Sequence, residues 1–182
     1  MNINMFRMAN PADAIAIVAL VNGAYRPQLN VSGWTHESDW VEGERTNTTQ
    51  VMEMMAKPEA VILLGFDGAD MVACVHVEKV GEQSHIGMLA VNPLLQGSGA
   101  GKQMLAHAED YAMRVFGAQK FVMVVLSVRT ALMSFYCRRG YQPAGAVMDY
   151  PIAAGVGTPK VAGLTIEVLE KHSSIRHPSA VL

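Results

Sequence analysis

Residues 84–116 have the sequence SHIGMLAVNPLLQGSGAGKQMLAHAEDYAMRVF. The pattern predicts a strand over 84–91 that stops at Pro93, a glycine-rich turn, and a helix that continues to Phe116. The first amides of that helix have no partner within the helix, and the helix dipole gives them positive partial charge. Amides in this position bind anions. We therefore interpret the turn as an anion-binding site.

The spacing of the turn excludes two kinds of nucleotide loop. A nucleotide-hydrolase loop that ended at Gly101-Lys102 would need a glycine at position 96 and a serine or threonine at position 103. Both positions hold glutamine, Gln96 and Gln103, so this loop is excluded. A dinucleotide fingerprint that began at Gly97 would place its third glycine on Lys102, and no acidic residue ends a strand about twenty positions later. Taken alone, the turn also fits a simple connection between strand and helix.

Composition favours one globular domain. The chain has 182 residues, of which 51% are hydrophobic, and this is enough for a single sizeable core. We expect the domain to span residues 1–170 and residues 171–182 to form a flexible C-terminal tail. The net charge is -2 and the basic residues are scattered, so we expect no nucleic-acid partner.

The sequence also indicates where the protein is found. Its longest apolar runs are well short of the roughly 18 residues that span a bilayer, and its first residues lack the pattern of a secretory signal. Cys74 and Cys137 have neither a Cys-x-x-Cys partner nor a neighbouring histidine cluster, which argues against a disulfide framework and a zinc site. We expect no metal, no membrane partner and a cytoplasmic location.

The remaining elements are expected from periodicity, caps and turn residues. Before the glycine turn we expect a strand over 3–8, a helix that begins after Asn10 and stops at Gly23, an irregular segment over 25–45, a helix over 47–55 capped by Thr48 or Thr49, and strands over 60–66 and 71–80 joined by a hairpin turn at 67–70. After the glycine-turn helix we expect a strand over 120–128, a helix over 130–139, an extended piece from Tyr141, and a last strand over 161–169.

Two motifs resemble those of a known family. The turn is similar to the Gln/Arg-x-x-Gly-x-Gly/Ala pyrophosphate loop of the GNAT superfamily of acyl-coenzyme-A-dependent N-acyltransferases, with Gln96, Gly99 and Gly101 at the defining positions. The segment SFYCRRGY at 134–141 resembles the Phe/Leu-Tyr-x-x-x-Gly-Phe/Tyr signature of that family, at the distance from the loop where the family carries it.

The resemblance covers the chain to about Leu169, because the order of expected elements also follows the family. The stretch from Trp34 to Arg45 is similar to a subgroup of small bacterial-type members. The resemblance implies an α/β fold (an α+β mixed sheet) with a central, mostly antiparallel sheet of about seven strands flanked by about four helices. It also implies acetyl-CoA as the cofactor.

Family resemblance assigns the cofactor contacts. The backbone of the preceding strand would pair with the pantetheine arm, and the amides of the turn would hold the pyrophosphate. The cofactor-binding residues expected on this basis are Leu89, Ala90, Val91, Gln96, Gly97, Ser98, Gly99, Ala100, Gly101, Lys102 and Arg129. Arg129 departs from the family, because many members carry an asparagine there that helps to hold the coenzyme.

Transfer of an acetyl group to an amine requires a neutral amine, a stabilised oxyanion and a protonated leaving thiolate. We expect Tyr136 to protonate the thiolate, since the pKa of a phenol, about 10, is close to the pKa of a thiol, about 8.5. The alternative is that Tyr136 only packs in the core. His85 is the expected base because its pKa suits that role, although a lone strand histidine is more often structural. Glu37 and His76 are weaker candidates, and a base acting through water would leave no mark in the sequence.

The resemblance implies an N-acetyltransferase that acts on the primary amine of a small or amino-acid-like molecule by direct attack through a tetrahedral intermediate. Trp34, Glu37 and Arg45 are the expected acceptor contacts, although a surface salt bridge also fits Arg45. A catalytically silent acyl-CoA-binding domain and a protein N-terminal or lysine acetyltransferase are the alternatives. Oligomeric state stays open, with a homodimer among the options.

Overall fold

The structure is a computed structural model, and it describes residues 3–27 and 33–173. The four α-helices are α1 (Ala14–Tyr25), α2 (Thr48–Ala56), α3 (Ala100–Phe116) and α4 (Thr130–Cys137). The strands of the main sheet are β1 (Met5–Met8), β3 (Ala60–Asp67), β4 (Asp70–Val80), β5 (Gln83–Val91), β6 (Lys120–Leu126), β7 (Gln142–Asp149) and β9 (Thr165–His172). The sheet has seven strands in the order β1-β3-β4-β5-β6-β9-β7, and this confirms the predicted mixed fold.

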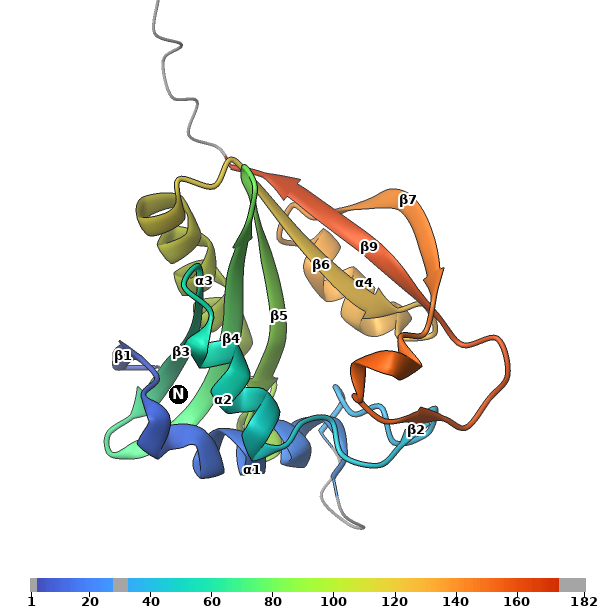
Figure 1. The fold of residues 1–182 in the computed structure, drawn as a ribbon, viewed down its shortest axis with the longest axis horizontal. Coiled ribbons are helices and arrows are strands. Elements are labelled where there is room, and N and C mark those ends of the chain that lie inside the picture. Colours follow the sequence, from blue (N-terminus) through green and yellow to red (C-terminus); the bar gives the residue numbers. More distant parts are fainter. Residues whose placement is uncertain (1–2, 28–32, 174–182) are drawn as a thin grey trace, which may run out of the picture.

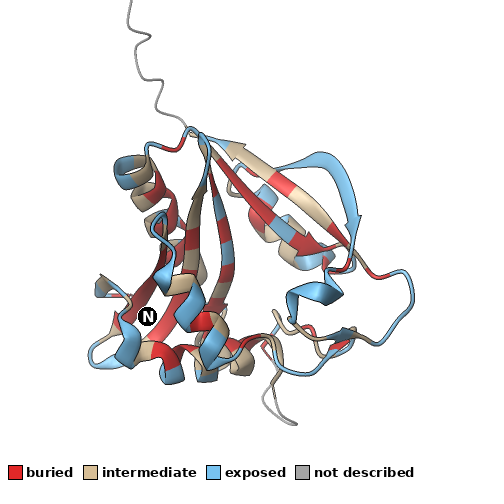
Figure 2. Cartoon of the chain, in the orientation of Figure 1, coloured by how far each residue is buried: buried red, intermediate tan, exposed pale blue. Residues whose placement is uncertain are grey.

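The sheet is covered on both faces. Leu63 of β3 packs in the core under α3 and α4, whereas its neighbours Ile62 and Leu64 pack in the core under α1 and α2. Figure 2 shows the buried residues along the central strands and on the inner sides of the helices. The nearly continuous apolar run of β3 follows from this arrangement, because both of its faces are covered.

Several helix boundaries differ from the sequence predictions, and α4 ends at Cys137 rather than residue 139. Gly23 does not end α1, which continues to Tyr25 and keeps Ala24 in the core. Asn47, not Thr48 or Thr49, caps α2: its side chain accepts from the Gln50 amide (2.9 Å), and the Gln50 side chain accepts from the Asn47 amide (3.1 Å). This reciprocal pair satisfies two helix-end donors, which a single threonine would not do.

The strands β5 and β6 separate after a short parallel contact. They pair only over Gln83–His85 and Lys120–Val122. Further along β5, its register with β4 shifts at a bulge where Met88 has a φ of 51°. A bulge bends and twists the strand that carries it. The two strands therefore diverge as a V in Figure 1, and their open ends face the glycine turn and α4.

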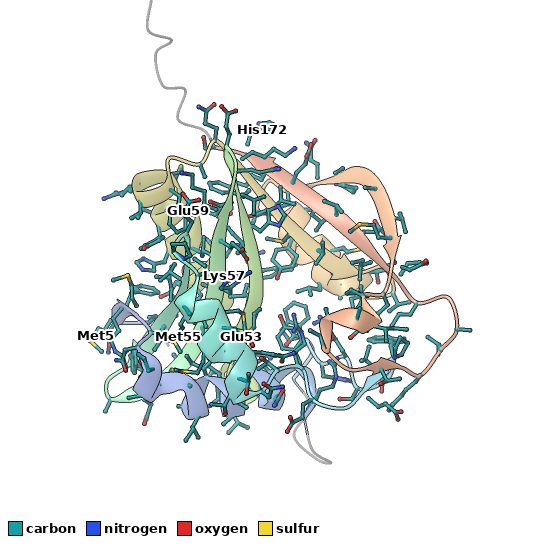
Figure 3. The ribbon with its side chains drawn as sticks, in the orientation of Figure 1. Met5, Glu53, Met55, Lys57, Glu59 and His172 are labelled. Atoms are coloured by element: carbon teal, nitrogen blue, oxygen red, sulfur yellow. The ribbon has the colours of Figure 1, made fainter. Side chains whose placement is uncertain are left out.

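The C-terminal part extends the sheet beyond β6. β9 lies between β6 and β7 and is antiparallel to both. It begins at Thr165 rather than Val161 and extends to His172, so it continues into the segment assigned to the tail. His172 lies at the end of the sheet where β5 and β6 meet, and Met5 lies at the β1 edge (Figure 3). Residues 174–182 lie outside the described part.

The segment predicted to be irregular holds one short strand. β2 (Val41–Glu42) pairs with β8 (Thr158–Pro159) in a separate two-stranded ribbon. Val41 packs in a small core with Tyr150 and Ile166, which anchors the ribbon to the end of β9. In the described part of the chain, no helix is long and apolar enough to cross a membrane.

Candidate active site

The glycine turn leaves the start of α3 open. Gly97 and Gly99 have φ values of 83° and 97°, in the left-handed region that favours glycine. Gly99 is the N-cap of α3, and no side chain caps that helix end. A Cβ added at Gly101 would make ordinary contacts of 3.6 Å with Phe135 and 3.7 Å with Val91. The helix start can thus accept an anion through backbone donors.

Gln96 ties this turn to the segment before β2. Its Nε2 donates to the Thr35 hydroxyl (2.7 Å) and to the Val91 carbonyl (3.3 Å), while its Oε1 is buried without a partner in the described structure. The Gln96 side chain also packs on Gly33, where a Cβ would lie 2.4 Å from Oε1. Gln96 therefore holds two chain segments together at the turn.

A cavity of about 210 Å³ opens in front of the turn. Its walls come from the turn, the end of β5 and α4. The predicted residues that line it are Trp34, Leu89, Val91, Gln96, Gly97, Gly99, Gly101, Lys102, Arg129 and Tyr136. Of the other predicted residues, Ala90 and Ala100 are buried in the core, and Ser98 donates its hydroxyl to the Leu95 carbonyl (2.6 Å); the backbone contacts expected of them stay predictions.

A second cavity of about 110 Å³ lies between the diverging ends of β5 and β6. Glu37 and Arg45, two of the expected acceptor contacts, line it, whereas Trp34 lines the first cavity. The residues shared by both cavities are Tyr25, Leu89, Arg129, Leu132 and Tyr136. The sheet's divergence therefore creates two adjoining spaces with one common wall.

Tyr136 occupies that common wall. It is 7% exposed, and its ring packs edge-on against Phe135 (5.2 Å) and Tyr141 (5.9 Å). Burial raises the pKa of its phenol above the usual value, while Arg129 and Arg139 act against this rise. The phenol is therefore a weaker acid than expected from the sequence, but it is protonated at neutral pH and can donate a hydrogen bond.

The shared wall is held by a buried ionic network. Glu37 accepts from Arg129 at one carboxylate oxygen (2.7 Å) and from Arg26 at the other (2.6 Å). Arg129 also donates to the Thr35 carbonyl, and Arg26 donates to the Val156 carbonyl (3.2 Å). Since both Glu37 oxygens are engaged, this carboxylate joins the segments that frame the cavities rather than standing free as a base.

The structure does not bring His85 to the cavities. Its side chain is exposed on β5 beside Val122, at the end where β5 and β6 still pair, and it lines neither cavity. His76 is also remote from them: it lies on β4, and burial lowers its pKa to about 4. The expected base is therefore absent from both described cavity walls.

Sequence reasoning missed several residues of the site, among them Tyr25 and Arg139. Tyr25 lines both cavities and donates its hydroxyl to the Leu89 carbonyl (3.1 Å). The sequence prediction ends this helix at Gly23, whereas Tyr25 is the last residue of α1. Arg139 lines the first cavity with its guanidinium 3.4 Å from the Phe135 ring centroid, although the sequence indicated only a cation at a helix end.

Residues 19–141 match the model of a family described as the acetyltransferase (GNAT) family. No curated protein matches the chain. The ribosomal-protein-S18-alanine N-acetyltransferase from Escherichia coli aligns with a TM-score of 0.73 at 14% identity, over 98% of this chain and 99% of that one.

Two further solved structures are similar. An N-acetyltransferase from Staphylococcus aureus Mu50 aligns with a TM-score of 0.70 at 14% identity, over 92% of this chain and 96% of that one. The PaiA N-acetyltransferase from Thermoplasma acidophilum, solved with coenzyme A, aligns with a TM-score of 0.67 at 13% identity, over 93% and 98% of the two chains. At these identities the likeness establishes the fold.

Proposed function

Because the chain belongs to the acetyltransferase (GNAT) family and is therefore an acyltransferase that uses acetyl-CoA, we propose that it acetylates the primary amine of a small, amino-acid-like molecule. The observation that carries this proposal is the pair of adjoining cavities with Tyr136 in their common wall. The first cavity begins at an anion-binding helix start and suits the cofactor. The second suits the acceptor.

The residues of the first cavity fit coenzyme A. The open start of α3 would hold the pyrophosphate through backbone donors, and Arg139 and Lys102 add positive charge at the same cavity. The bulged end of β5 at Leu89 would hold the pantetheine arm in the manner of an added strand. Acetyl-CoA supplies the thioester that the amine attacks.

We assign the proton transfers as follows. The amine nitrogen forms the new C–N bond, the C–S bond breaks, and the Tyr136 phenol donates a hydrogen bond or its proton to the departing sulfur. Because Glu37 is bound by two guanidiniums and His85 lies elsewhere, we propose that water removes the amine proton. Arg45 and Arg129 favour a neutral amine in the second cavity, since like charges repel an ammonium.

We also propose a cytoplasmic location, on the basis of two cysteines that are both free. Cys74 is buried and Cys137 is exposed, and neither lines a cavity. Direct attack by the amine therefore needs no cysteine acyl carrier. Steady-state kinetics with both substrates varied should give intersecting rather than parallel double-reciprocal lines.

The proposal is tested by two measurements on the full chain. Calorimetric titration with acetyl-CoA should show binding, and release of free thiol should increase when a panel of small primary amines is added. Absence of acetyl-CoA binding would refute the proposal. Tight binding without turnover on any amine of the panel would favour the silent acyl-CoA-binding alternative, and turnover only on peptides would favour a protein acetyltransferase.

A further inference from the structure

We propose that Arg45 selects acceptors that carry a carboxylate in addition to the amine. This inference rests on the proposed function, because it concerns the second cavity as the acceptor site. It starts from one observation: Arg45 lines that cavity, and in the described part of the chain it has no ion-pair partner. The remaining residues, 1–2, 28–32 and 174–182, include no Asp or Glu.

The charge of the cavity is not balanced from within. Its lining contains Arg45, Arg129 and a single carboxylate, Glu37. Glu37 is occupied by Arg129 and by Arg26, which lies behind the wall. A guanidinium in a partly buried, largely apolar cavity is stabilised by an anion. The second cavity therefore has positive charge to offer to a ligand.

Arg45 is also held in place. Asn22 of α1 accepts from the Arg45 amide (2.8 Å) and the Thr46 amide (3.1 Å), and it donates to the Thr46 carbonyl (3.0 Å). The Arg45 guanidinium lies 5.3 Å from the centroid of the Tyr25 ring. Backbone clamping and stacking reduce the freedom that the side chain would lose on binding a ligand. Such preorganisation favours specific recognition of a planar anion.

The geometry links Arg45 to the reacting end of the cavity. The ring of Tyr25 carries Arg45 on its face, while its hydroxyl binds the Leu89 carbonyl at the common wall. The Tyr25 side chain thus lies between the Arg45 guanidinium and the edge of β5 where the thioester is expected. Because Arg45 and Tyr136 line the same cavity, a short amino acid bound there would place its amine toward Tyr136 and its carboxylate on Arg45.

The first experiment compares acids with their amides as acceptors. The pairs are glycine and glycinamide, β-alanine and β-alaninamide, and 4-aminobutyrate and its amide. For each compound, kcat/KM of Arg45→Met is divided by that of the wild type, which cancels differences in amine basicity. We expect a loss of about 10- to 100-fold for the best acid, with its amide little affected. Arg45→Lys should keep part of the acid preference because it keeps the charge.

Controls separate charge selection from damage to the fold. Arg114→Met removes an exposed arginine of α3 and should leave every ratio unchanged. Asn22→Ala should reduce the acid preference without changing acetyl-CoA affinity, since Asn22 positions the backbone of Arg45 and Thr46 and does not line the first cavity. Thermal unfolding of each variant reports its stability. An equal loss for acid and amide in Arg45→Met overturns the inference.

The second experiment does not depend on turnover. The three N-acetylated acids and their N-acetylated amides are titrated by calorimetry into the enzyme with coenzyme A present. We expect at least one acid to bind more tightly than its amide, and Arg45→Met to remove the difference. This result without any acetyl transfer would uphold the inference and refute the proposed function. Acetyl transfer together with equal affinity for acid and amide, or with no binding of any acid, would uphold the proposed function and refute the inference.

Discussion

Glu37 Oε1 lies 2.7 Å from Nη1 of Arg129, although the two residues are 92 positions apart in the chain. The pair joins the segment before β2 to the start of α4. Both side chains are nearly inaccessible, with exposures of 9% and 6%. Because Glu37 is shielded from water, its two guanidinium partners have no other anion in its place in the described structure. Loss of the Glu37 charge would therefore leave uncompensated positive charge at the wall of both cavities.

Glu37→Gln should destabilise the fold by about 3–5 kcal/mol, since removing one member of a buried ionic group leaves its partners unpaired. Urea unfolding monitored by circular dichroism measures this change. Glu53→Gln is the matched control: Glu53 is exposed on α2 (Figure 3) and should change stability by about 0.5 kcal/mol or less. Equal effects of the two substitutions would contradict the structural role of Glu37.

Tyr136→Phe should lower kcat by about 10- to 100-fold, as expected for loss of a general acid, while acetyl-CoA affinity is kept. The hydroxyl has no partner in the described structure, so stability should hardly change. Because burial raises the phenol pKa, the kcat of the wild type should not decline through loss of this proton up to pH 9. Unchanged turnover in the variant would remove Tyr136 from the chemistry.

Gly99→Ala should weaken acetyl-CoA binding, because the cap of α3 has a φ of 97° and a side chain there costs about 1–2 kcal/mol. Gly68→Ala imposes similar strain at a φ of 62° in the β3–β4 hairpin, remote from the cavities. It should reduce stability without changing affinity. Gly101→Ala should leave the stability of the fold nearly unchanged, since its Cβ meets only ordinary contacts with the protein. Calorimetry on the three variants distinguishes these outcomes.

His85→Gln should leave kcat nearly unchanged, rather than cause the roughly 100-fold loss typical of a removed general base. The reason is its exposed position at the paired end of β5 and β6, away from both cavities. A thiol-release assay at saturating substrates measures this. A large loss would restore His85 as the base and would require a rearrangement of β5.

His76 should make the protein less stable as the pH falls from about 6.5 to 4. Burial lowers its pKa to about 4 in the folded state, below the unfolded value of about 6.5, so the unfolded chain takes up the proton first. The contribution of His76 to stability is fully present above the unfolded pKa, and its loss reaches about 3 kcal/mol near pH 4. Unfolding of His76→Gln across this range should show a smaller pH dependence than the wild type.

The individual elements could be predicted because their signals are local, whereas the arrangement of the sheet was implied by the family resemblance. The glycine turn, the Asp67-Gly68 hairpin and the apolar run of β3 each lie within a few residues, and the structure contains all three. Helix ends were less certain: the capping pair of Asn47 and Gln50 competes with two adjacent threonines that look equally suitable.

The residues of the site could be predicted most directly where they belong to contiguous motifs. The glycine turn and Tyr136 belong to motifs and line the first cavity. The partners of Arg129 could not be predicted, because Glu37 and Thr35 reach it through tertiary contacts that leave no periodic pattern. His85 was misleading for the same reason: its place relative to the cavities depends on where β5 and β6 separate.

Gln96 connects the proposed acetyl-CoA site to the proposed acceptor site. It fastens the glycine turn to Thr35, whose carbonyl in turn binds Arg129 in the wall of the second cavity. Acetyl-CoA at the turn and an acceptor between the strands would both act on this short segment. We therefore expect each ligand to change the affinity of the other, by the same factor whichever one is bound first, because a coupling free energy is reciprocal.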